Sequence, residues 1–142
     1  MSEQEEVRRI LVAADGSAQS IKAVRLAAEI AKATGAELAI VHVNEMHDMP
    51  VLMTEGEHPD EESIGQKVLS DALEIAMSEG VNAKGFIKRG HAAGQILVFA
   101  SEYSPQLIFM GTRGLGRTMA MVMGSVSQVV VHGAKTSVVV VK

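Results

Sequence analysis

Short apolar runs alternate along the chain with longer segments whose apolar residues recur every three or four positions. The short runs are typical of buried strands, and they occupy residues 8–14, 36–43, 82–88, 106–110 and 137–141. The longer segments have the spacing of amphipathic helices, and they occupy residues 17–34, 60–79, 91–103 and 125–132. Residues 44–59 lack both patterns and are expected to form a long connection.

The sequence indicates the buried face of the first helix and the ends of the first and last helices. One face of the first helix is expected to hold Ile21, Val24, Ala28 and Ala31. Gly35 follows this helix and is expected to end it, because glycine tolerates the left-handed conformation at that place. Gly133 is expected to end the last helix.

Strands that alternate with helices imply βαβ units and a parallel sheet covered on both faces. Because such crossovers are right-handed, we expect one open α/β sheet of five strands with helices on both faces. No linker and no internal repeat interrupts the pattern. The sequence therefore predicts a single domain over residues 1–142.

Composition narrows the class of protein. Apolar residues make up 47% of the chain and aromatic residues only 3%, which predicts an aliphatic core. The absence of cysteine excludes disulfides, thiolate metal sites and cysteine nucleophiles. The chain starts with acidic and polar residues, and no apolar run approaches the roughly 20 residues that cross a bilayer. We therefore expect a cytoplasmic protein that does not enter a membrane.

The charges are unevenly distributed along the chain. The net charge of −4 argues against general nucleic-acid binding. All 17 acidic residues lie at or before Glu102, so the last 40 residues carry only positive side-chain charges. This distribution suits a site for a small anion such as phosphate, but it equally suits an apolar region with few charges of either sign.

Two loops of unusual composition follow the first and fourth strands. Open parallel sheets bind ligands at the carboxyl ends of their strands, where the strand order reverses. Asp15-Gly16-Ser17 follows the first strand, and a glycine-rich stretch at 111–127 follows the fourth. If these strands are neighbours, the two loops face each other across a crevice. Asp15 is then either a ligand contact or only a cap at the start of a helix.

The glycine-rich stretch carries the donors that a phosphate needs. Glycines let backbone N–H groups approach an anion closely, and a helix that begins at Ser125 presents unpaired N–H groups. Ser125 and Ser127 add hydroxyl donors, and Arg113 and Arg117 would screen the charge of a polyphosphate. The alternative is a connection whose glycines merely permit turns.

Two common phosphate motifs fit this stretch poorly. Residues 111–118 approach the P-loop pattern, but Arg117 stands where that loop requires Lys. The dinucleotide pattern G-x-G-x-x-G fails because Met119 stands where the third glycine should follow Gly114 and Gly116.

A longer pattern fits better. Gly111, Gly114, Gly124 and Ser125 match G-x2-G-x9-G-S, which resembles the ATP-binding signature of the universal stress protein family. The resemblance extends over nearly the whole chain, and its landmarks include Asp15-Gly16-Ser17, His42-Val43, residues 110–114 and the closing valines. It implies a Rossmann-like sheet of the adenine nucleotide alpha hydrolase type, with strand order 3-2-1-4-5. It also implies a homodimer in which the C-terminal strands pair.

The resemblance implies a nucleotide site as well. Asp15 would contact the ribose or adenine, and Val43 would meet adenine through its backbone. Gly111, Gly114, Gly124 and Ser125 would hold the phosphates, and Val126 and Ser127 would extend that contact. The expected site residues are Ala14, Asp15, Val43, Met110, Gly111, Arg113, Gly114, Gly116, Arg117, Gly124, Ser125, Val126 and Ser127. The ligand would be ATP, or ADP or AMP in its place, with Mg²⁺ bridging the phosphates.

The chain departs from the family pattern in two places. The family often has a polar residue where Gly116 stands, and often a proline before the last strand, where Lys135-Thr136-Ser137 stands. Neither change touches the four signature positions. The first leaves the loop more flexible.

The expected function is that of a regulatory ATP-binding protein of the stress response, without robust catalysis. No Ser–His–Asp order, paired carboxylates or metal-ligand cluster stands out in the sequence. One alternative is a slow ATPase or nucleotidyl-transfer enzyme, with Asp15 as its general base or metal contact. The other is a nucleotide-free dimer that acts through a regulatory protein partner.

Overall fold

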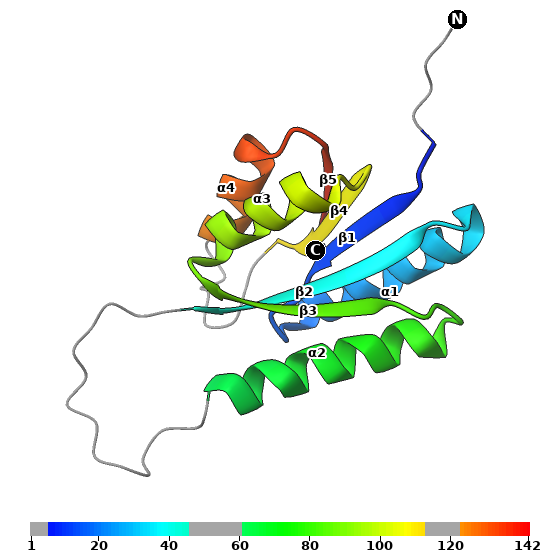
Figure 1. Cartoon of the computed structure of the whole chain (residues 1–142), viewed down its shortest axis with the longest axis horizontal. Helices are drawn as coiled ribbons and strands as arrows, with labels where there is room; N and C mark the ends of the chain where they lie inside the picture. Colours follow the sequence, from blue (N-terminus) through cyan, green and yellow to red (C-terminus); the bar gives the residue numbers. More distant parts are fainter. Residues whose placement is uncertain (1–5, 46–60, 113–122) are drawn as a thin grey trace, which may run out of the picture.

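The structure is a computed structural model, and it describes residues 6–45, 61–112 and 123–142. In this part of the chain five strands form one parallel sheet in the order β3-β2-β1-β4-β5 (Figure 1). The strands are β1 Arg9–Ala13, β2 Glu37–Glu45, β3 Lys84–Gly90, β4 Leu107–Gly111 and β5 Ser137–Val141. The helices are α1 Ala18–Thr34, α2 Glu61–Ser78, α3 Ala92–Tyr103 and α4 Ser125–Gly133. The expected fold class and strand order are confirmed.

Helices cover the sheet on both faces because successive strand residues point to opposite sides. Ile10 and Val12 of β1 pack with α1 and α2, whereas Leu11 between them packs with α3 and α4. Figure 1 shows the two helix pairs on opposite sides of the sheet. All three β1 side chains are fully buried, and burying such a side chain is worth about 1.5–3 kcal/mol. The central strand therefore anchors both halves of the core.

The ends of α1 are set by local sequence. The Ser17 hydroxyl caps the helix by accepting a hydrogen bond from the N–H of Ser20, 3.2 Å away. Gly35 closes the helix with φ +76°, and its N–H donates to the carbonyl of Ala31. This conformation favours glycine because a Cβ would strain it. The expected helix end at Gly35 is confirmed.

The second strand is longer than its sequence predicts. Asn44 and Glu45 belong to β2 rather than to the connection that follows it. They pair with Arg89 and Gly90, because β3 itself continues to Gly90 and supplies backbone partners for them. Asn44 is buried despite its polar side chain. Otherwise the expected element boundaries agree with the structure to within two residues.

Two smaller expectations were wrong. Ile21 is 38% exposed, and the buried face of α1 uses smaller residues such as Ala23 and Ala27. Gly133 does not end α4, which includes it and is capped by Ala134. A Cβ at Gly133 would lie 2.8 Å from Cδ1 of Leu97 on α3, so this glycine serves the close packing of α4 against α3.

Candidate functional site

The strand order reverses between β1 and β4, which are neighbours in the sheet. The chain leaves β1 through α1 to reach β2 on one side, while β4 lies on the other. The carboxyl ends of these strands therefore border the crevice where open α/β sheets bind ligands. Asp15 follows β1, and Gly111 is the last residue of β4. The adjacency on which the crevice depends is thus present.

Asp15 is held in place by the start of α1. Its carboxylate oxygen Oδ1 accepts the N–H of Ser17 at 2.9 Å, and its own N–H donates to Oγ of Ser20 at 3.3 Å. The helix cap is Ser17, so Asp15 is not the capping residue. The Asp15 side chain is exposed, and among the described residues its carboxylate has no further hydrogen bond. The second oxygen can accept a hydrogen bond from a ligand.

Ala14 links β1 to β2 at the edge of the crevice. Its N–H donates to the carbonyl of Val41 at 2.9 Å. Its own carbonyl lies 2.8 Å from Nδ1 of His42. Because a carbonyl can only accept, the His42 ring must carry its hydrogen on Nδ1. His42 is therefore a hydrogen-bonded residue of β2.

Gly111 allows β4 to meet the first turn of α1. A Cβ at this position would lie 2.8 Å from Cβ of Gln19 and 3.0 Å from the backbone N of Ser20. Backbone atoms cannot yield as a flexible side chain can. The glycine is therefore required for close packing of strand and helix, a role that the sequence analysis had not assigned to it.

The start of α4 is bound to the end of β4. Gly124 is the N-cap of α4, and its N–H donates to the carbonyl of Thr112 at 2.5 Å. The Ser127 hydroxyl donates to the carbonyl of Gly111 at 2.7 Å. The first N–H groups of any α-helix have no acceptor within the helix. These bonds therefore fix a helix N-terminus at the carboxyl end of β4.

The Ser127 bond corrects one expectation. The hydroxyl was expected to donate to phosphate, but its hydrogen is donated to the protein's own backbone. The side chain is 3% exposed, so it belongs to the packed base of the site. Its contribution to binding an anion would come from the backbone N–H instead.

Three apolar site residues lie on the face covered by α3 and α4. Met110 is buried, and Val43 and Val126 are half-buried against the same cluster. Met110 can therefore contribute only backbone atoms to a ligand. Val43 lies near the carboxyl end of β2, paired with Lys88 of β3. Val43 and Val126 stay partly exposed while packing against this cluster.

Four of the expected site residues fall outside the described part of the chain. They are Arg113, Gly114, Gly116 and Arg117. The described residues on either side, Thr112 and Gly124, are joined by a backbone hydrogen bond. Both ends of the intervening segment therefore lie at the carboxyl end of β4.

Two residues of this site were not predicted from the sequence. Ser20 is 2% exposed, and its hydroxyl both accepts from Asp15 and donates to the carbonyl of Ser17 at 3.2 Å. A serine on the otherwise apolar buried face of α1 was the available signal. Thr112 is 6% exposed, and its carbonyl receives Gly124 N–H as well as a longer bond from Ser127 at 3.3 Å. Nothing in the local sequence distinguishes Thr112.

Residues 6–45, 61–112 and 123–142 lack two features. They contain no group of three or more His, Cys, Asp or Glu side chains that could hold a metal ion. They also contain no helix with the length and apolar character needed to span a membrane.

The sequence of the chain matches a known protein family. The profile of the universal stress protein family matches residues 6–142. The chain belongs to the universal stress protein family. The resemblance carried by the glycine and serine pattern is therefore confirmed.

Individual universal stress proteins match over nearly their full length. The protein YxiE of Bacillus subtilis is 34% identical over 145 residues, covering 94% of this chain and 98% of the relative. A universal stress protein of Thermus aquaticus is 35% identical over 141 residues, covering 95% and 98%. A solved universal stress protein of Archaeoglobus fulgidus in complex with dAMP is 28% identical, with a TM-score of 0.71 and coverage of 97% and 100%.

Proposed function

We propose that this universal stress protein binds an adenine nucleotide, ATP in particular, in the crevice between β1 and β4. The supporting observation is a chain of contacts that joins the two sides of the crevice. Ser20 binds the N–H of Asp15, and its own backbone N would lie 3.0 Å from a Cβ at Gly111. Gly111 in turn accepts the hydroxyl of Ser127. A carboxylate and a helix N-terminus thus border one crevice.

The two sides suit different parts of a nucleotide. The open carboxylate oxygen of Asp15 would accept a hydrogen bond from the ribose or adenine, and Val43 would meet adenine through its backbone. The first turn of α4, with Ser125 and Val126, would face the phosphates with N–H groups and a partial positive charge. The relative from Archaeoglobus fulgidus, solved with dAMP, supports an adenine nucleotide as the ligand.

The segment 113–122 would complete the phosphate site with Arg113, Gly114, Gly116 and Arg117. Mg²⁺ would accompany ATP, neutralising part of the triphosphate charge. The oxygen donors of the crevice, such as the Asp15 carboxylate, are of the kind that Mg²⁺ prefers. Since the described residues hold no ready-made ion cluster, phosphate oxygens and waters would supply most of its ligands.

The same geometry favours a regulatory binder over a fast hydrolase. Rapid phosphoryl transfer to water requires a group that orients the attacking water. One oxygen of the Asp15 carboxylate already accepts a hydrogen bond from the N–H of Ser17. The place of this carboxylate beside β1 suits the nucleoside end of the ligand. We therefore propose that the nucleotide controls the protein rather than being turned over rapidly.

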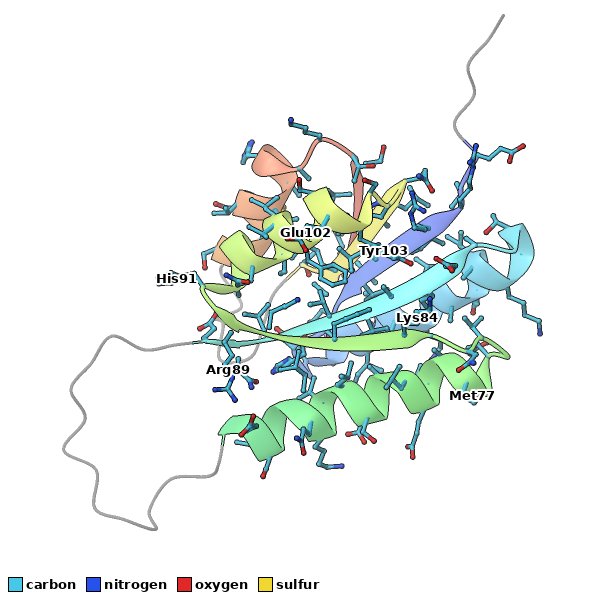
Figure 2. The ribbon with its side chains drawn as sticks, in the orientation of Figure 1. Met77, Lys84, Arg89, His91, Glu102 and Tyr103 are labelled. Carbon is cyan, nitrogen blue, oxygen red and sulfur yellow. The ribbon has the colours of Figure 1, made fainter. Side chains whose placement is uncertain are left out.

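The two edges of the sheet differ in a way that supports a homodimer through β5. Exposed backbone groups make an edge strand prone to pairing, and charged residues on the edge oppose it. β3 carries Lys84 and Arg89 along its edge (Figure 2). β5 instead presents four consecutive valines, 138–141, all half-buried. A second copy pairing along β5 would cover these valines.

Calorimetric titration of the full chain with ATP, AMP and GTP tests the nucleotide assignment. We expect saturable binding of ATP and AMP, weak binding of GTP, and severe loss of ATP binding in Gly124→Val with the fold retained. The valine side chain would stand where phosphate is expected. Absence of heat, together with an unchanged melting temperature at large ATP excess, would overturn the assignment, because a ligand of the folded state must stabilise it.

A further inference from the structure

One peptide unit at the crevice is held at both of its polar atoms. The Ala14 carbonyl lies 2.8 Å from Nδ1 of His42, and the N–H of Asp15 in the same peptide donates to Oγ of Ser20 at 3.3 Å. His42 comes from β2 and Ser20 from α1, so two separate elements fix one peptide plane. The orientation of that plane sets the direction in which the Asp15 side chain leaves the backbone.

The His42 ring makes a hydrogen bond to a carbonyl that would normally pair with the backbone of the neighbouring strand. In a parallel ladder, the Ala14 carbonyl would accept the N–H of Val43, after the bond from Ala14 N–H to the Val41 carbonyl. β1 ends at Ala13, and the Ala14 carbonyl instead accepts a hydrogen bond from Nδ1 of His42. The His42 side chain thus donates to the Ala14 carbonyl in place of the Val43 N–H. That N–H points from β2 toward the β1 side, where the crevice begins.

Packing keeps the ring in this position. A Cβ at Gly65, on α2, would lie 3.0 Å from Cδ2 of His42 and would clash with Oδ1 of Asn44. α2 therefore rests directly on both side chains, and glycine is what lets it come so close. With the helix on one side and the Ala14 carbonyl as its partner, the ring has little freedom to rotate.

We propose that His42 is a positioning residue of the nucleotide site. By donating to the Ala14 carbonyl, His42 fixes the direction of the Asp15 carboxylate. The Val43 N–H then has no bond to Ala14 and is free to donate to the adenine ring. The inference rests on the proposed function, which supplies the ligand, but it concerns a side chain that does not itself touch that ligand. It assigns a role to a residue whose ring would otherwise only fill space beneath α2.

Three variants separate a positioning role from a packing role. His42→Leu removes the donor, and we expect the Kd for AMP and ATP to rise about tenfold, the scale of one lost hydrogen bond. His42→Asn restores an N–H donor at the position of Nδ1, and we expect a Kd within about threefold of the wild type. Asn44→Ala is the matched control: it lies beneath the same Gly65 but does not bond to Ala14, so the Kd should stay unchanged.

Two results of the titrations would overturn the proposal. One is equal weakening in His42→Asn and His42→Leu. The other is loss of affinity in Asn44→Ala as large as that in His42→Leu, which would show that packing under α2 alone matters. Melting temperatures of all three variants show whether any loss of affinity merely follows stability.

Hydrogen exchange separates failure of this inference from failure of the proposed function. In the nucleotide-free protein, the amides of Ala14 and Asp15 should exchange faster in His42→Leu and at the wild-type rate in His42→Asn. If the wild type binds no nucleotide but this pattern holds, the proposed function fails while His42 still orders the peptide. If the two amides exchange at the same rate in the wild type, His42→Leu and His42→Asn, the positioning role is wrong whatever the titrations give.

Discussion

The hydroxyl of Ser127 on α4 donates to the carbonyl of Gly111, the last residue of β4, across 2.7 Å. Gly111 also lies against the first turn of α1. One residue thus connects a helix on each face of the sheet at the edge of the crevice. The position of the α4 N-terminus relative to Asp15 is therefore set by packing at Gly111, which makes that glycine a sensitive point of the fold.

Gly111→Ala should destabilise the protein. Its Cβ would meet Gln19 and the backbone N of Ser20 at 2.8–3.0 Å, so strand and helix must separate. Overpacking of this kind costs about 1–3 kcal/mol in the free energy of unfolding. Gly94→Ala is the matched control, because a Cβ on this α3 residue has open space and alanine favours the helix by about 0.5–1 kcal/mol. Urea denaturation of both variants checks the prediction, and equal stability of the two would contradict it.

Asp15→Asn should weaken nucleotide binding without unfolding the site. Asparagine keeps an oxygen that can accept the Ser17 N–H, so the turn before α1 should persist. It removes the charge that strengthens a hydrogen bond from a ribose hydroxyl or adenine amine. The loss of a charge-assisted bond, about 1.5–3 kcal/mol, predicts a rise in Kd of roughly 10- to 100-fold. Calorimetry with AMP measures it, and an unchanged Kd would place the ligand away from Asp15.

The order of the elements could be predicted from the sequence because each apolar run is short and each helix has a clear periodicity. Gly35 was interpretable because a glycine after a helical segment has one common role there. The inclusion of Asn44 in β2 was not interpretable from the sequence, because it depends on pairing with Arg89 of β3, which is a tertiary property. The partners of Ser127 and His42 were hidden for the same reason. Each bonds to a backbone carbonyl brought near by the fold, which leaves no mark in the local sequence.

Tyr103→Phe should leave stability at neutral pH unchanged or raise it by up to about 1 kcal/mol. Tyr103 lies between α3 and the sheet (Figure 2), and its hydroxyl oxygen is buried without a hydrogen-bond partner among the described residues. Phenylalanine keeps the ring contact with Phe99, whose centroid is 5.7 Å away. Urea denaturation at pH 7 measures the change. A loss well above 1 kcal/mol would reveal a partner for the hydroxyl.

The same residue predicts an alkaline dependence. Burial raises the pKa of the Tyr103 hydroxyl, the charge of Glu37 raises it further, and Arg9 opposes both. A raised pKa means that the folded state prefers the neutral phenol. This contribution is fully present below the unfolded pKa of about 10 and is lost as the pH rises through the higher folded pKa. Stability should therefore fall more steeply above about pH 10 in the wild type than in Tyr103→Phe. Identical pH profiles would refute this.

Val140→Lys should convert the proposed homodimer to a monomer. Val139 and Val141 pack into the core against the α1 face, and Val138 packs against the other, whereas Val140 belongs to neither cluster of the described residues. A charge there would oppose pairing along β5 while sparing the core. Val98→Lys is the control, because Val98 is 51% exposed on α3, away from the edge. Light scattering at micromolar concentration gives the masses. A monomeric wild type would rule out the dimer, and a dimeric Val140→Lys would move the interface elsewhere.

Amide chemical shifts recorded during titration of the full chain with ATP and Mg²⁺ locate the bound nucleotide on the protein. We expect saturable shifts at residues 14–17, at Val43, and at 111–112 and 124–127. The amino edge of the sheet, around Gln106 and Thr136, should not respond. Shifts confined to that opposite edge, or no shifts at ATP concentrations far above those of the protein, would refute binding in the crevice between β1 and β4.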